Sequence, residues 1–139
     1  VIRSQKHELK LIPSIWPTKG IVTSGFGWRT HPISGKSDFH SAIDINTSYG
    51  APIYAPAAGT VIFVGWDGAY GRLIKIQHND RISTRFAHLA AYSVEEGDEV
   101  VRHQLIGYVG SSGSATGSHL HYEVRIFGKA VNPYNYILN

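Results

Sequence analysis

The chain has 139 residues and a mass of 15.3 kDa, with 42% hydrophobic and 17% charged residues, as expected of one globular domain with its own core. The formal net charge is +3, but Lys and Arg are scattered, which argues against nucleic-acid binding and favours an extended acidic partner. The absence of cysteine excludes disulfides, thiolate metal sites and cysteine nucleophiles, so any chemistry must come from histidines, carboxylates and hydroxyls.

The first fifteen residues are polar and only weakly helical. They include VIRSQKHELKLI, and Pro13 and Pro17 end any helix that begins there. The chain has no signal-peptide pattern and no apolar run long enough to cross a membrane. We therefore expect residues 1–15 to connect an upstream domain or membrane anchor to a folded domain over 16–139, which itself makes no membrane contact.

Short apolar or alternating runs follow, separated by Gly, Pro, Asn, Asp and Ser. The runs are GIVTSGFG, APIYAP, GTVIFVGW, RLIKIQH, TRFAHL, QLIGYVG and HLHYEVRIF. Such spacing is typical of short strands joined by tight turns. We predict a mainly β fold, a single domain of antiparallel sheet with long loops around a metal cleft.

The surroundings of the eight histidines divide them into two groups. We expect His7, His31 and His103 to lie at the surface, and His78, at the end of RLIKIQH, to be structural with its ring hydrogen-bonded in a turn. The other four lie in or beside apolar β segments, where burying an unsatisfied imidazole is costly. These candidates for function are His40, His88, His119 and His121.

The spacing of these histidines favours a metal site. His119 and His121 alternate on one predicted strand, so both rings leave the same face, with Cα atoms about 6.5 to 7 Å apart. His40 and Asp44 would be about 13 Å apart in a straight strand, so the chain has to bend between them, and the small residues 41–42 are the predicted bend.

Two histidines and one aspartate would leave a coordination position open for water, as in catalytic zinc sites. Zinc there would acidify the water and polarise a bound carbonyl, which makes amide hydrolysis accessible without a covalent nucleophile. No HExxH motif supplies a glutamate base. The remaining imidazoles are therefore the candidates for proton transfer and oxyanion stabilisation.

The motifs HSAID, FAHL and HLH occur in this order within the framework WPTKGIVTSGFGWRTHP, YGAPIYAPAAGTVIFVG and VEEGDEVVRHQLIGYVG. In this the chain resembles the lysostaphin-type (M23, LytM) zinc metallopeptidases, which cut the peptide part of bacterial peptidoglycan. The resemblance covers residues 16–138. It implies a LytM-like fold, peptidoglycan as the partner, and a location in the periplasm or the extracytoplasmic envelope.

The resemblance also assigns roles to the candidate residues. It implies one zinc ion held by His40, Asp44 and His121, and two unligated catalytic histidines, His88 and His119. Four positions depart from the family pattern without removing any of these side chains. They are Ala42, Arg72, Phe86 and Ser118. We expect the first and third to affect substrate fit or rate.

The entry segment GFGWRTHPISG resembles envelope-biogenesis members, so we expect a D-alanyl cross-link rather than a glycyl bridge to be cut. Two other classes are weighed against the enzyme. A LytM-like scaffold or activator of another wall hydrolase is disfavoured because all five site residues are present. Two segments, APIYAPAAGTVIFVG and VEEGDEVVRHQLIG, suggest a biotinyl or lipoyl carrier. This class is disfavoured because neither segment contains a lysine that could be modified.

Overall fold

The computed structural model describes residues 11–30, 35, 37–113 and 117–137. His7, His31 and most of the predicted connector lie outside these residues. The described residues form a large sheet, a smaller sheet and a separate hairpin, and the strand pairs are antiparallel. No helix among them is long and apolar enough to pass through a membrane.

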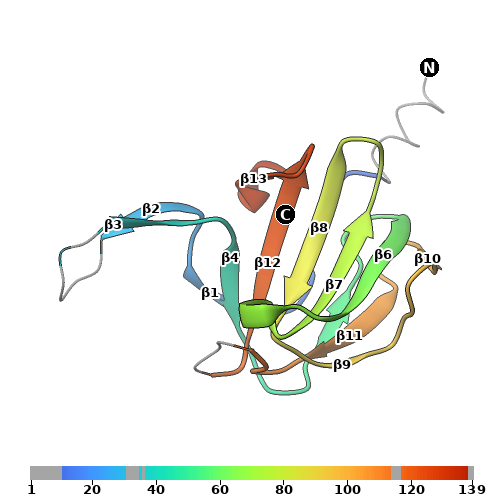
Figure 1. Ribbon diagram of the computed structural model, residues 1–139, viewed down its shortest axis with the longest axis horizontal. Coiled ribbons are helices and arrows are strands. Elements are labelled where there is room, and N and C mark those ends of the chain that lie inside the picture. The colour runs from blue at the N-terminus through green and yellow to red at the C-terminus, as the bar shows by residue number, and fades with distance from the viewer. Residues whose placement is uncertain (1–10, 31–34, 36, 114–116, 138–139) are drawn as a thin grey trace.

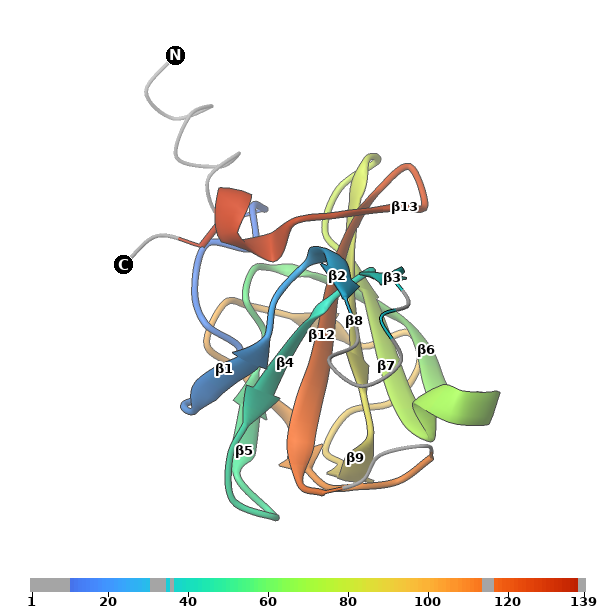
Figure 2. The same cartoon turned by 90° about the vertical axis from the view of Figure 1, so that its left-hand side faces the viewer.

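The large sheet has eight strands within the described part of the chain. Its path is β1 (Ile21–Ser24), β4 (Ile43–Asn46), β12 (His119–Ile126), β8 (Ile82–Ala87), β7 (Arg72–Gln77), β6 (Gly59–Trp66) and β10 (Glu99–Val100). β13 (Lys129–Val131) pairs with β12 outside this path. β12 therefore lies between β4 and β8, as Figure 2 shows.

The smaller sheet has the order β5 (Pro52–Tyr54), β11 (Leu105–Val109) and β9 (Leu89–Tyr92). The hairpin consists of β2 (Gly27–Thr30) and β3 (Ser37–His40) and extends from the β4 side, away from β6 and β10 (Figure 1). Two short 3-10 turns complete the described elements, η1 (Gly68–Tyr70) and η2 (Pro133–Asn135).

Alternation along β4 and β12 separates the core from the other face of the large sheet. On β12, Leu120 and Tyr122 are fully buried in the hydrophobic core, as are Ile43 and Ile45 on β4. The residues between them point to the opposite face, because side chains alternate along a strand. That outer face carries Asp44 and both histidines of the HLH motif.

The predicted fold class is confirmed, since each of the seven apolar runs contains a strand. Two features escaped prediction for physical reasons. The hairpin strands GWRT and SDFH mix polar and aromatic residues without an apolar face. TRFAHL reads as one strand, but His88 divides it between β8 and β9, which belong to different sheets.

The structural interpretation of His78 is confirmed. Its side chain is buried, Nδ1–H donates to the carbonyl of Ala58 at 2.8 Å, and Nε2 accepts from the Thr84 hydroxyl at 2.8 Å. Burial lowers the pKa of His78 to about 4, although the bond to Ala58 acts in the opposite direction. The ring is therefore neutral in the folded chain. His103 is exposed, as predicted.

Candidate metal centre

A bend between β3 and β4 brings His40 to Asp44. β3 ends at His40, β4 begins at Ile43, and the intervening residues 41–42 form no strand. His40 Nε2 consequently lies 3.2 Å from Asp44 Oδ2. The other ring nitrogen, Nδ1, lies 2.9 Å from the carbonyl of Gly25 and so donates its proton there. The bend is where the sequence predicted it, and Nε2 is left facing the carboxylate.

Strand pairing brings the third donor to the same point. His121 of β12 is the register partner of Asp44 of β4, and His121 Nδ1 lies 3.3 Å from Asp44 Oδ1. One ligand atom from each of His40, Asp44 and His121 lies within 4.8 Å of the others. Two imidazole nitrogens and a carboxylate oxygen thus converge from three strands.

The carboxylate of Asp44 has the properties of a cation ligand. Its Oδ1 is buried and accepts no well-formed hydrogen bond within the described part of the chain; its neighbours there are ring nitrogens of His121 at 3.3 Å and His119 at 3.8 Å. A buried charged oxygen is costly without a strong partner. Burial would raise the pKa of Asp44, but His121 and His40 outweigh it and hold the pKa well below its ordinary value. The ionised group fits a divalent ion that accepts nitrogen and oxygen ligands.

His121 lies between two carboxylates. Burial would lower its pKa, but Asp44 and Glu123 raise it to about 9. A ligating imidazole has to be neutral, so a metal ion that binds here displaces a proton from His121.

His88 and His119 flank the three donors. Their ring centroids are 4.9 Å apart, and the His88 ring lies 5.7 Å from that of His121. His88 Nδ1–H donates to the Ser112 carbonyl at 2.7 Å, and His119 Nδ1 lies 3.1 Å from the Gly117 carbonyl. Backbone carbonyls therefore hold Nδ1 of both rings. Nε2 of His119 lies 3.8 Å from Asp44 Oδ1, beside the proposed ligands, and Nε2 of His88 remains for proton transfer. Burial is the main cause that lowers the pKa of His88, which favours the neutral base.

The backbone of His88 is strained. Its φ is 64°, in the left-handed region that non-glycine residues rarely adopt. The amide of His88 donates to the Tyr70 carbonyl at 2.8 Å, and its carbonyl accepts from Gly110 N at 3.1 Å. These bonds hold the residue between β8 and β9 at the point where the chain changes sheets. Such strain is characteristic of functional sites in other proteins.

The sequence model of peptidase family M23 matches residues 38–133, a span that contains all five candidate residues. The chain belongs to peptidase family M23. As a LytM-type domain, it is 45% identical over 112 residues to the DD-carboxypeptidase/endopeptidase Mpg of Neisseria meningitidis, a match that covers 81% of this chain and 26% of Mpg. It is 38% identical over 123 residues to the murein hydrolase activator NlpD of Salmonella dublin, covering 88% of this chain and 30% of NlpD. The M23 domain thus spans between a quarter and a third of the length of these relatives.

Solved structures share the fold of the M23 domain. A zinc-containing peptidase from Vibrio cholerae superposes with a TM-score of 0.80 and 35% identity, over 86% of this chain and 38% of that one. The catalytic domain of lysostaphin from Staphylococcus simulans gives a TM-score of 0.75 and 29% identity, over 86% of this chain and 91% of that one.

Two departures from the family pattern in the M23 domain are buried side chains. Phe86 is fully buried and packs against Tyr122 in the core, with ring centroids 5.4 Å apart. Ala42 is also fully buried. Because both side chains are buried, neither contacts a substrate directly, and the expected effect on substrate fit or rate stays a prediction that would act through packing.

A pocket adjoins Asp44 and His119 in the M23 domain. Its lining comprises Thr23, Asp44, Asn46, Gly117, Ser118 and His119. Ser118, another departure from the family pattern, donates its hydroxyl to the Thr47 carbonyl at 2.8 Å. The pocket is mainly polar and lies beside the convergent donors, where a peptide group can approach them.

Sequence reasoning missed the residues that support His121. Glu123 Oε2 accepts from His121 Nε2 at 2.7 Å and from the Tyr70 hydroxyl at 2.8 Å. Burial would raise the pKa of Glu123, but His121, Tyr70 and Arg125 lower it to about 2. The HLHYEVR alternation places Glu123 on the same face as His121 and was a usable signal. Tyr70 lies 53 residues from Glu123, and no motif indicated it.

Proposed function

We propose that this M23 domain is a zinc-dependent endopeptidase that hydrolyses amide bonds in peptidoglycan stem-peptide cross-links. The observation that carries the proposal is the convergence of five side chains, from separate parts of the sequence, on one face of the large sheet. They are His40, Asp44, His88, His119 and His121. A domain that only binds the wall does not require two further imidazoles, each held at Nδ1 by a backbone carbonyl, beside a convergent set of metal ligands.

In this proposal His40 Nε2, an Asp44 oxygen and His121 Nδ1 hold the zinc ion. Bound zinc supplies a Lewis acid and lowers the pKa of a water toward neutrality. The hydrogen bonds on the remote nitrogens of His40 and His121 keep those rings in the orientation that ligation needs.

His88 and His119 are the proposed proton-transfer groups. The pKa of His88 is lowered mainly by burial, which favours the neutral ring. Neutral His88 accepts a proton from the attacking water at Nε2 and gives it to the leaving amine. His119 stands 4.9 Å from it, ring to ring, at the edge of the pocket. From there the imidazolium form of His119, with Nδ1–H on the Gly117 carbonyl, is placed to donate Nε2–H to the oxygen of the scissile carbonyl as negative charge develops.

The relatives support a D-alanyl cross-link rather than a glycyl bridge as the bond that is cut. Identity to Mpg, named as a DD-carboxypeptidase/endopeptidase, is 45%, and identity to the V. cholerae DD-endopeptidase ShyB is 38%. Identity to the lysostaphin catalytic domain is 29%. The net charge of +3 suits a polyanionic wall, and this substrate places the domain in the extracytoplasmic envelope.

The similarity to NlpD favours a second candidate function, activation of another wall hydrolase. The two functions predict different results with purified components. The M23 domain, loaded with zinc, is incubated with purified walls that carry direct cross-links and with walls that carry glycyl bridges, and the products are identified by mass spectrometry. We expect release of uncross-linked peptides from the first wall type only, abolished by a chelator and by His121→Ala.

A domain that retains zinc, cleaves neither wall type and stimulates a separate hydrolase would establish the activator and overturn the enzyme. Cleavage of glycyl bridges alone would overturn the proposed bond.

A further inference from the structure

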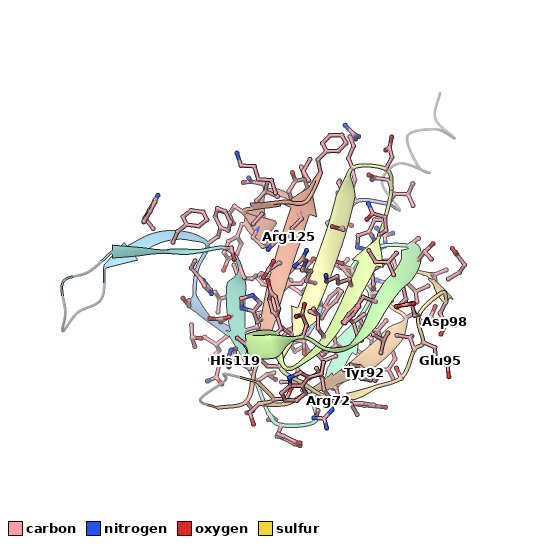
Figure 3. All side chains as sticks on the ribbon, viewed as in Figure 1. Arg72, Tyr92, Glu95, Asp98, His119 and Arg125 are labelled. Atoms are coloured by element: carbon pink, nitrogen blue, oxygen red, sulfur yellow. The ribbon has the colours of Figure 1, made fainter. Side chains whose placement is uncertain are left out.

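The row of side chains on the outer face of β12 continues past the metal centre. Figure 3 labels His119 and Arg125 toward the two ends of this row, and His121 and Glu123 lie between them in the sequence. Glu123 is 0% exposed, although it is charged and lies on the face opposite the core. A carboxylate buried to this degree needs a complete set of donors.

Both oxygens of Glu123 have such donors. Oε1 accepts from Arg125 Nε at 2.7 Å and forms an ion pair with Nη2 at 2.7 Å. Oε2 accepts from His121 Nε2 and from the Tyr70 hydroxyl. Arg85, the register partner of Glu123 on β8, adds a second positive charge beside this group. The carboxylate is therefore fixed from three sides and not only by its ion pair.

This arrangement selects one tautomer of His121. A ring that donates Nε2–H to Glu123 presents a bare Nδ1, and Nδ1 is the nitrogen that lies 3.3 Å from Asp44. If Glu123 turned away, either nitrogen could carry the proton and the ring could rotate. Carboxylates that orient ligating histidines in this way contribute to metal affinity as well as to geometry.

Tyr70 holds Glu123 in this position and also contacts the other side of the centre. Its hydroxyl donates to Glu123, and its backbone carbonyl accepts from the amide of His88. The turn that contains Tyr70 packs closely against the backbone at Gly113. Gly71 has φ 67°, and a Cβ there would lie 2.5 Å from Gly113 N. One residue thus connects a proposed metal ligand with a proposed proton-transfer group.

We propose that Tyr70 and Glu123 are positioning residues of this centre. Tyr70 keeps Glu123 on Nε2 of His121, and Glu123 keeps Nδ1 of His121 available to the metal. The inference rests on the proposed metal site but not on which bond is cut. The alternative is that Glu123, Tyr70 and Arg125 form a structural cluster, whose disruption lowers stability alone.

Tyr70→Phe and Glu123→Gln separate these roles, with Tyr122→Phe as the matched control. The Tyr122 hydroxyl is buried on the core face and has no hydrogen-bond partner in the described part of the chain, so its removal breaks no bond there. For each protein we would measure zinc affinity by chelator competition, thermal unfolding, and the exchange rate of the His121 Nε2 proton by NMR in the zinc-loaded state.

We expect Tyr70→Phe and Glu123→Gln each to weaken zinc binding by about 10- to 100-fold and to accelerate exchange of the His121 Nε2 proton. The double variant should lose no more affinity than Glu123→Gln, because both residues act through one hydrogen-bonded chain. Tyr122→Phe should match the wild type in zinc affinity and proton exchange.

Wild-type zinc affinity and proton exchange in Tyr70→Phe and Glu123→Gln, with only a lower melting temperature, would overturn the inference. A wild-type domain without zinc affinity would overturn it together with the proposed function. A wild type that binds zinc but cleaves no wall would contradict only the function, because affinity and proton exchange still report on positioning.

Discussion

Asp44 and His121 are register partners on neighbouring antiparallel strands, and their Oδ1 and Nδ1 atoms lie 3.3 Å apart. The contact therefore follows from the regular pairing of β4 with β12 and does not depend on the conformation of a loop. Removing the negative charge of Asp44 should therefore weaken metal binding strongly. We expect Asp44→Asn to weaken zinc affinity by orders of magnitude, because a three-ligand site has no spare donor.

Isothermal titration with zinc would measure this change. Asp67→Asn is its control, since Asp67 is an exposed carboxylate that accepts no capping hydrogen bond. Stoichiometric zinc of wild-type affinity in Asp44→Asn would show that another group provides the ligand.

His88 should be replaced by asparagine rather than alanine. Asparagine tolerates the left-handed φ of 64° that His88 adopts, whereas alanine adds backbone strain to the loss of the imidazole. We expect His88→Asn to keep zinc and the fold but to reduce turnover by about 10² to 10⁴-fold. His103→Asn is the control, because His103 is exposed and also left-handed, with φ 76°.

Wall-peptide cleavage, zinc content and thermal unfolding would be measured together for both variants and for His119→Gln, which should behave like His88→Asn. Full activity in either site variant would remove that histidine from the proposed mechanism.

His78 should make the stability of the domain depend on pH. Its pKa is about 4 in the folded chain and 6.5 in the unfolded chain, so as the pH falls the unfolded chain binds the proton first. The stability due to neutral His78 is therefore fully present above pH 6.5 and is lost as the pH falls toward 4. The loss amounts to about 3 kcal/mol.

Urea unfolding with a chelator present, at several pH values between 4 and 7, would measure the effect. The wild type should lose more stability over this window than His78→Gln. Parallel stability curves for wild type and His78→Gln would refute the assignment.

A substitution in the turn between β12 and β13 should stabilise the domain. Phe127 and Gly128 form its two-residue loop, with φ values of 50° and 80°, and Phe127 is 76% exposed. Asn-Gly is the preferred pair for a loop in which both residues have positive φ. We expect Phe127→Asn to raise the free energy of unfolding by about 0.5 to 1 kcal/mol. Phe127→Ala should give no gain, because alanine lacks the polar side chain whose local hydrogen bonds make the left-handed conformation acceptable for asparagine. Equal effects of the two variants would exclude turn strain as the cause.

Residues 11–14, which the sequence assigned to the connector, contact the folded domain. Arg102 donates to the Ser14 hydroxyl at 3.1 Å, Asn79 donates to the Leu11 carbonyl at 3.4 Å, and Pro13 is buried. Deletion of residues 1–10 should leave melting temperature and zinc affinity almost unchanged, whereas deletion of 1–15 should lower the melting temperature. A large loss from the shorter deletion would show that the segment belongs to the core.

Local rules accounted for much of the fold and the site. Period-two alternation placed His119 and His121 on one face, and the distance between His40 and Asp44 in a straight strand required the observed bend. Contacts between distant segments were beyond such rules. The role of Tyr70 depends on a turn pressed against Gly113, and the left-handed backbone of His88 depends on where two sheets meet.

Alternation assigns Asp44, His119 and His121 to one face of the large sheet and Leu120 and Tyr122 to the other. Replacement of Asp44 or His119 therefore does not enter the apolar core, and we expect a domain that loses either side chain to stay folded. His121 is different, because its loss would also leave the buried Glu123 carboxylate without one of its donors. A folded domain without catalysis is therefore reached more easily through Asp44 or His119 than through His121.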